Sequence, residues 1–108
     1  MDIETIRQKV REGDYLVRSQ AVLHALKEGF ERQDMVDAVL NGQIIESYPD
    51  DKRVLISGHT ELGQNFRIYL HVVCEYANPM YIEFITAYIP DEKRWEKPDF
   101  RRRKRRRR

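Results

Sequence analysis

The chain has 108 residues, of which 41% are hydrophobic and 35% charged, and its formal net charge is +2. This length fits one domain that can bury a core without disulfides or metal. The last eight residues, 101–108 (RRRKRRRR), supply +8, so residues 1–100 carry −6. Because like charges repel, we predict one domain over residues 1–100 and a disordered basic tail over 101–108. Such a tail favours polyanionic partners, which include RNA, DNA, an acidic protein face and an anionic membrane surface.

A single cysteine, Cys74, excludes an internal disulfide and a cysteine-based metal site. The simplest compartment is therefore the reducing cytoplasm. No apolar run approaches the roughly 18 residues of a membrane span, and the first residues resemble neither a signal nor a transit peptide. Histidines and carboxylates do not recur at metal-ligand spacing. We therefore expect no membrane contact, no metal and no cofactor.

The first half of the chain has the period of helices. Residues 2–12 predict a helix, because Asp2 can cap it and apolar residues recur at i, i+3 and i+7. Residues 15–18 predict a short extended piece. Ser19 is a suitable N-cap for a second helix that runs to Glu28 and ends at Gly29. A third helix is predicted over residues 31–40.

Both later helices have apolar residues that predict a buried stripe. In the second helix the expected inward residues are Val22, Leu23 and Leu26. In the third helix they are Met35, Val36, Val39 and Leu40.

The second half of the chain changes to the period of strands. Residues 44–48, 53–59, 66–76 and 80–89 predict four strands, and a short turn at 77–79 joins the last two. Helices followed by an antiparallel meander indicate an α+β fold. We predict the order α-β-α-α-β-β-β-β, with the N-terminal helices packed on one face of a four-stranded antiparallel sheet.

Alternation separates the two faces of the predicted sheet. One parity of the third strand is apolar and should face the helices: Phe66, Ile68, Leu70, Val72 and Cys74. The short turn would pair residues whose numbers sum to about 157, which sets His71 opposite Thr86 and Tyr69 opposite Tyr88. The second face would then carry Arg67, Tyr69, His71, Thr86 and Tyr88, with Arg94 beyond it.

This second face combines groups that suit RNA. Aromatic rings stack on bases, and arginines hold phosphate. A proton-transfer group can also assist cleavage at the 2′-hydroxyl without metal. The candidate catalytic residues are His71, Tyr69 and Tyr88. The candidate nucleic-acid-binding residues are Arg67, Arg94, Arg101, Arg102, Arg103, Lys104 and Arg105.

A polar sheet face has a plainer explanation as well. Tyrosine and threonine are good strand residues, and a sheet with helices on one side usually exposes polar groups on the other. The second hypothesis is therefore a non-enzymatic interaction module, in which this face forms a homodimer or binds a partner and the tail anchors nucleic acid.

Two stretches of the chain resemble a bacterial family, number 4258 among the domains of unknown function. One contains Ser19-Gln20-Ala21 and leads to the sequence LNGQIIESYP at residues 40–49. The other contains LHVV at 70–73 and ITAY at 85–88. The resemblance covers roughly residues 15–90. Gln20 stands where the family usually has histidine, and glutamine cannot exchange a proton near neutral pH.

The family looks related in architecture to the RelE-like and BrnT-like ribonuclease toxins. That resemblance implies a toxin-like protein that cleaves mRNA and is neutralised by a small acidic antitoxin. Since fold does not fix function, the activity is an expectation.

Overall fold

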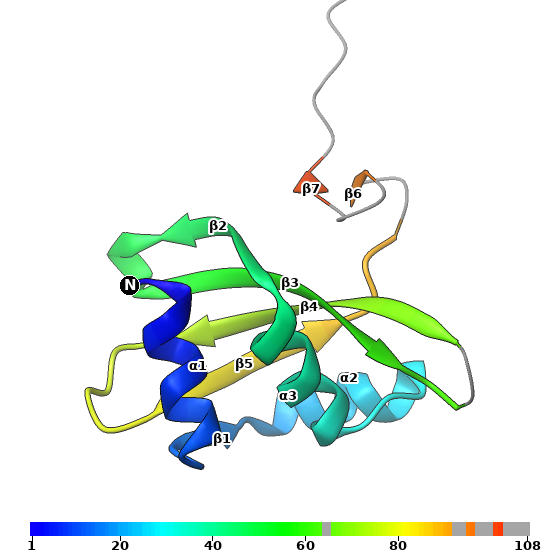
Figure 1. The fold of residues 1–108 in the computed structure, drawn as a ribbon, viewed down its shortest axis with the longest axis horizontal. Coiled ribbons are helices and arrows are strands. Elements are labelled where there is room, and N and C mark those ends of the chain that lie inside the picture. The colour runs from blue at the N-terminus through cyan, green and yellow to red at the C-terminus, as the bar shows by residue number, and fades with distance from the viewer. Residues whose placement is uncertain (64–65, 92–94, 97–100, 103–108) are drawn as a thin grey trace, which may run out of the picture.

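The computed structural model describes residues 1–63 and 66–91, together with the backbone of 95–96 and 101–102. The fold is α+β, with three helices and a five-stranded mixed sheet, as Figure 1 shows. The elements follow in this order: α1 (Ile3–Arg11), β1 (Tyr15–Val17), α2 (Ser19–Glu28), α3 (Arg32–Asn41), β2 (Gln43–Tyr48), a 3-10 turn (Pro49–Asp51), β3 (Arg53–Glu61), β4 (Arg67–Glu75), β5 (Ile82–Tyr88), β6 (Trp95–Glu96) and β7 (Arg101–Arg102).

The strand order in the main sheet is β1-β5-β4-β3-β2. Strands β2 to β5 pair antiparallel, as predicted, but β1 pairs parallel with β5. The prediction of a four-stranded, wholly antiparallel sheet is therefore wrong. Hydrogen bonds at both ends of β1 explain the fifth strand: Ile82 N–H donates to the Asp14 carbonyl, and Arg18 N–H donates to the Phe84 carbonyl.

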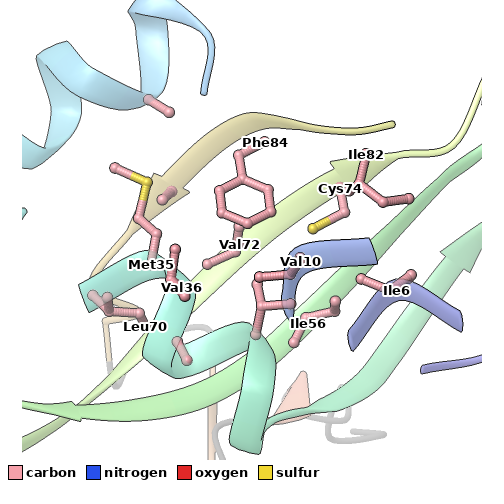
Figure 2. Packing of buried hydrophobic residues seen from close by; sticks show 14 of the residues in the cluster. Ile6, Val10, Met35, Val36, Ile56, Leu70, Val72, Cys74, Ile82 and Phe84 are labelled. Carbon is pink, nitrogen blue, oxygen red and sulfur yellow. The ribbon is translucent and has the colours of Figure 1, made fainter. Parts of the chain in front are cut away.

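Helices α1 and α3 cover one face of the sheet, while α2 lies along β5 (Figure 1). Helix α1 begins as predicted, because the Asp2 carboxylate accepts a hydrogen bond from Thr5 N–H at 2.8 Å, and this bond lowers the pKa of Asp2. The core lies between these helices and the sheet (Figure 2). Its labelled residues come from α1, α3 and the strands β3, β4 and β5: Ile6, Val10, Met35, Val36, Ile56, Leu70, Val72, Cys74, Ile82 and Phe84.

Helix α2 presents a different side to the protein from the predicted one. Its buried residues are Ala21 and Ala25, whereas Val22, Leu23 and Leu26 are exposed. Two small side chains let the helix approach β5 closely, and the larger apolar residues then point away. Ser19 is the first helical residue, and no side-chain hydrogen bond caps the helix at Arg18.

The predicted pairing of β4 with β5 is displaced by two residues. His71 lies opposite Tyr88 rather than Thr86, and Thr86 lies opposite Val73. The connection between the strands runs over residues 76–81, longer than the predicted turn, and a β-bulge at Ile85 resets the register before Phe84 pairs with Cys74. A shift of two residues keeps each side chain on its predicted face.

The ends of the predicted strands also needed correction. Phe66 precedes β4 and is 61% exposed, so it does not face the helices. Strand β3 continues to Glu61. In the predicted tail, the backbone of Arg101–Arg102 pairs antiparallel with Trp95–Glu96; residues 103–108 lie outside the described part of the chain.

Helix α3 and strand β3 touch backbone to backbone at Gly58. A Cβ atom at this position would lie 1.8 Å from the Ala38 carbonyl oxygen. We predict that Gly58→Ala lowers the free energy of unfolding by about 3 kcal/mol, because the helix must move away from the sheet. Urea denaturation monitored by circular dichroism measures the change.

Gly13→Ala is the matched control. Gly13 has φ +81° but open space around its Cα, so the added methyl causes only backbone strain, worth about 1 kcal/mol. Equal destabilisation by the two substitutions would contradict a steric role for Gly58.

Candidate functional site

The face of the sheet opposite α1 and α3, here called the outer face, carries the candidate site. Alternation and register place its side chains, since their neighbours along each strand are the core residues. The outer-face residues of the three central strands are Arg53, Leu55, Ser57, His59, Arg67, Tyr69, His71, Val73, Glu75, Glu83, Ile85, Thr86 and Tyr88.

His71 and Tyr88 form a pair at the middle of this face. They are opposite one another on β4 and β5, and His71 Nδ1 lies 3.2 Å from the Tyr88 hydroxyl. Their rings meet edge to face, with centroids 5.3 Å apart and planes at 68°. The pair joins two of the three predicted catalytic residues, in a contact that can move a proton between phenol and imidazole.

The two members of the pair differ in exposure. The His71 side chain is 0% exposed, whereas Tyr88 is half-buried. A substrate approaching the outer face therefore reaches Tyr88 first, and the imidazole can act on it only through the phenol. The sequence did not reveal this, because a polar residue in the middle of a strand predicts an exposed side chain.

Tyr69, the third predicted catalytic residue, belongs to a second aromatic pair. It lies opposite His59, with ring centroids 6.2 Å apart and planes at 73°. Both residues border a hollow of about 100 Å³ with Asn41, Gln43 and Gly58. His59 is half-buried within β3.

Arg67 is at the end of the outer face, where its side chain is 60% exposed. Its guanidinium lies 3.7 Å from the carboxylate of Glu61, which is equally open to water. Such an exposed pair contributes little to stability, so Arg67 can exchange this carboxylate for a phosphate at small cost.

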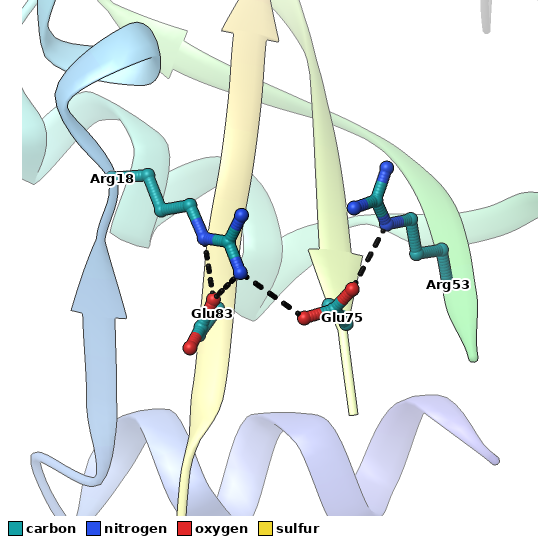
Figure 3. A network of polar contacts seen from close by, with 4 residues as sticks. All are labelled: Arg18, Arg53, Glu75 and Glu83. Atoms are coloured by element: carbon teal, nitrogen blue, oxygen red, sulfur yellow. Dashed lines mark hydrogen bonds and ion pairs between the residues drawn. The ribbon is translucent and has the colours of Figure 1, made fainter. Parts of the chain in front are cut away.

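Ion pairs occupy the other end of the outer face (Figure 3). Arg18 Nη2 lies 2.5 Å from Glu83 and 3.4 Å from Glu75, and Arg53 Nε lies 3.1 Å from the second oxygen of Glu75. Both arginines are neutralised here, so this end of the face does not attract phosphate.

Helix α2 reaches the outer face through His24. Its Nδ1 lies 2.9 Å from the Thr86 hydroxyl, and the side chain is half-buried. Gln20, at the position of the family's usual histidine, is exposed one turn earlier. His24 is thus a structural contact between helix and sheet, and its partner Thr86 lies two residues before Tyr88 on β5.

The structure does not place the side chains of the remaining predicted phosphate ligands. Arg94, Arg103, Lys104 and Arg105 lie outside the described residues, and for Arg101 and Arg102 only the backbone is described. Those six side chains stay predictions from the charge of the tail.

The described residues support neither metal binding nor a cysteine nucleophile. Within residues 1–63 and 66–91, no three histidine, cysteine or acidic side chains gather as a metal site would require. Cys74 is fully buried, and burial raises the pKa of its thiol, so the sulfur stays protonated and is no nucleophile. None of the helices in the described part of the chain is long and apolar enough to cross a membrane.

Glu75 is the centre of the ion-pair network, because each of its carboxylate oxygens contacts a different arginine. We predict that Glu75→Gln lowers the free energy of unfolding by about 1 kcal/mol and that added salt reduces this difference. Urea denaturation at low and high ionic strength measures both effects.

Glu61→Gln is the matched control, since it removes the exposed carboxylate beside Arg67 and should change stability by less than about 0.5 kcal/mol. A Glu75→Gln protein as stable as the Glu61→Gln protein would show that the network does not stabilise the sheet.

Comparison with known proteins identifies one family. A model with the description Domain of unknown function (DUF4258) matches residues 17–89, which is more than half of the chain and includes α2, α3 and β2 to β5. No curated protein and no solved structure matches the chain. The likeness to RelE-like and BrnT-like toxins therefore stays a prediction.

Proposed function

The chain belongs to the DUF4258 family, and from that membership and the geometry of the outer face we propose that it binds RNA and cleaves it without metal. The observation that carries the proposal is the contact of 3.2 Å between His71 Nδ1 and the Tyr88 hydroxyl. It joins a group that substrate can reach to a buried imidazole that can accept a proton.

In the proposed reaction, Tyr88 contacts the ribose and His71 receives the proton. The 2′-hydroxyl gives its proton to the Tyr88 oxygen while the phenol gives its own proton to His71 Nδ1. The 2′-oxygen attacks the adjacent phosphorus, and the bond from phosphorus to the 5′-oxygen breaks, with a proton from water completing the leaving group.

The neighbouring residues would bind the strand. Tyr69 offers a half-buried ring against which a base can stack, and Arg67 offers a weakly paired guanidinium for phosphate. The basic tail and Arg94 would add affinity without selecting sequence. A toxin of this kind would act in the cytoplasm and be neutralised by a small acidic antitoxin.

Removing the Tyr88 hydroxyl tests the chemistry. In EDTA, we expect wild-type protein to cleave RNA and Tyr88→Phe to be slower by about 100-fold or more, since the ring remains while the proton path is lost. Gel analysis of labelled RNA fragments measures the rate. Tyr81→Phe, which alters a half-buried tyrosine before β5, is the control and should keep full activity.

His71→Gln provides an independent test, because glutamine keeps hydrogen-bonding capacity but cannot accept the proton. No cleavage by wild-type protein, or equal cleavage by all variants, would reject the enzymatic proposal.

The complete burial of His71 favours a second candidate, the non-enzymatic interaction module. In that case the tail alone would hold nucleic acid, and the outer face would serve a partner or a second copy. The two candidates differ in what the protein without residues 101–108 does with RNA.

Deleting residues 101–108 separates the candidates. Eight charges can neutralise up to eight phosphates, so the slope of log affinity against log salt should become smaller by up to about 5 for single-stranded RNA. Fluorescence anisotropy with labelled RNA at several salt concentrations measures it. Residual binding that Tyr69→Ala abolishes supports RNA recognition by the outer face, while complete loss of binding supports the module.

A further inference from the structure

Helix α2 exposes large apolar side chains to solvent. Val22, Leu23 and Leu26 are 43%, 58% and 74% exposed. With Ser19 they follow the spacing i, i+3, i+4 and i+7, so all four lie along one side of the helix. We call Ser19, Val22, Leu23 and Leu26 the α2 face. None of the four side chains is ionisable.

This exposure is not a by-product of a poorly packed helix. The opposite side of α2 is well packed, because Ala21 and Ala25 are 0% and 4% exposed in the core and His24 bonds to Thr86. In Figure 1 the helix lies at the margin of the molecule, beyond β5. The α2 face is thus held rigidly outward, as an interaction surface requires.

A recess lies beside these projecting residues. It measures about 200 Å³ and is bordered by five apolar residues, Val22, Ala25, Leu26, Phe30 and Met35, together with Glu31 and Arg32. A surface that has both a projecting leucine and an apolar recess can receive a copy of itself. In a two-fold interface each subunit uses the same surface, so projections and recesses must occur together.

We propose that the α2 face joins two copies of this chain. Two α2 helices that run antiparallel about a two-fold axis between positions 22 and 23 bring Val22 of one subunit opposite Leu23 of the partner subunit. In the same arrangement Leu26 faces Ser19 of the partner subunit, so a large side chain meets a small one. The proposal does not depend on RNA binding or cleavage.

The charges around the α2 face favour a second copy over other partners. Lys27 flanks the α2 face, and Glu31 and Arg32 border the recess beside it. A membrane-binding helix has a strongly basic rim. The residues around the α2 face carry both positive and negative charges, so the same residues on a second copy can pack against them without like-charge repulsion.

The α2 face is smaller than a standard interface of about 800 Å² per partner, so the dimer should be weak. We expect a dissociation constant on the order of tens of micromolar. Apolar association also persists at high salt, unlike association through the basic tail.

Cysteine cross-linking tests the arrangement directly. Leu23→Cys should give a disulfide-linked dimer under mild oxidation, because position 23 lies half a residue from the two-fold axis and its two copies are therefore close together. The native Cys74 is fully buried and does not interfere. Met80→Cys is the matched control, since Met80 is 72% exposed in the β4–β5 connection, and it should stay mainly monomeric.

Sedimentation of the full chain tests the association itself. Wild-type protein should dimerise between about 10 and 500 µM in 0.5 M salt, and Leu23→Gln with Leu26→Gln should stay monomeric in that range. Both residues are exposed, so the double variant should keep the wild-type melting temperature. A monomeric wild-type protein at the highest concentration, equal cross-linking of the two cysteine variants, or binding of the α2 face to anionic lipid vesicles instead would overturn the proposal.

Discussion

The contact between α3 and β3 at Gly58 determines where the rest of the protein lies. Only a residue without a side chain lets the helix backbone come this close to the strand. Hydrogen bonds fix the helix on both sides of the contact: the Asn41 amide exchanges two bonds with the backbone of His59, and the Asp34 carboxylate accepts from the buried Thr60 hydroxyl at 2.7 Å. Together they position the α3 core residues over the sheet.

The same contact determines which side chains lie opposite one another on the outer face. Because β3 is fixed by α3, its pairing with β4 is regular from Arg53 to Glu61, and this places His59 opposite Tyr69. The irregular step comes later, at the β-bulge of β5. Below the bulge Glu83 joins the ion-pair network, and above it Tyr88 meets His71. The bulge thus separates a charge-neutralised end of the face from an aromatic end that contains the proposed catalytic pair.

Strand and helix patterns in the sequence were sufficient for the class of fold and for the faces of β4. Polar and apolar residues alternate there, and a strand can satisfy that pattern in only one way. The register of β4 with β5 could not be predicted from the sequence. It depends on the length of the β4–β5 connection and on a bulge that no local residue indicates. The burial of His71 was also hidden, since it depends on residues that are distant in sequence.

Helix α2 shows why apolar period alone can mislead. Three large apolar residues on one side predicted the buried stripe, yet the structure buries Ala21 and Ala25. The short distance between α2 and β5 favours the side of the helix with small residues. The spacing of apolar residues in the sequence does not reveal that distance. The charge of the tail can be read from the sequence, whereas the positions of its side chains lie outside the described residues.

The parallel pairing of β1 with β5 also bears on how the protein forms during synthesis. Residues 15–17 find their strand partner only when residues 82–84 have been made, so the sheet edge closes late. Until then α2 lacks the strand against which Ala21 and Ala25 pack. Long-range closure of this kind slows folding and leaves apolar surface open for longer. The nascent chain is therefore open to chaperones, or to a second nascent copy, along the same helix that stays exposed in the folded protein.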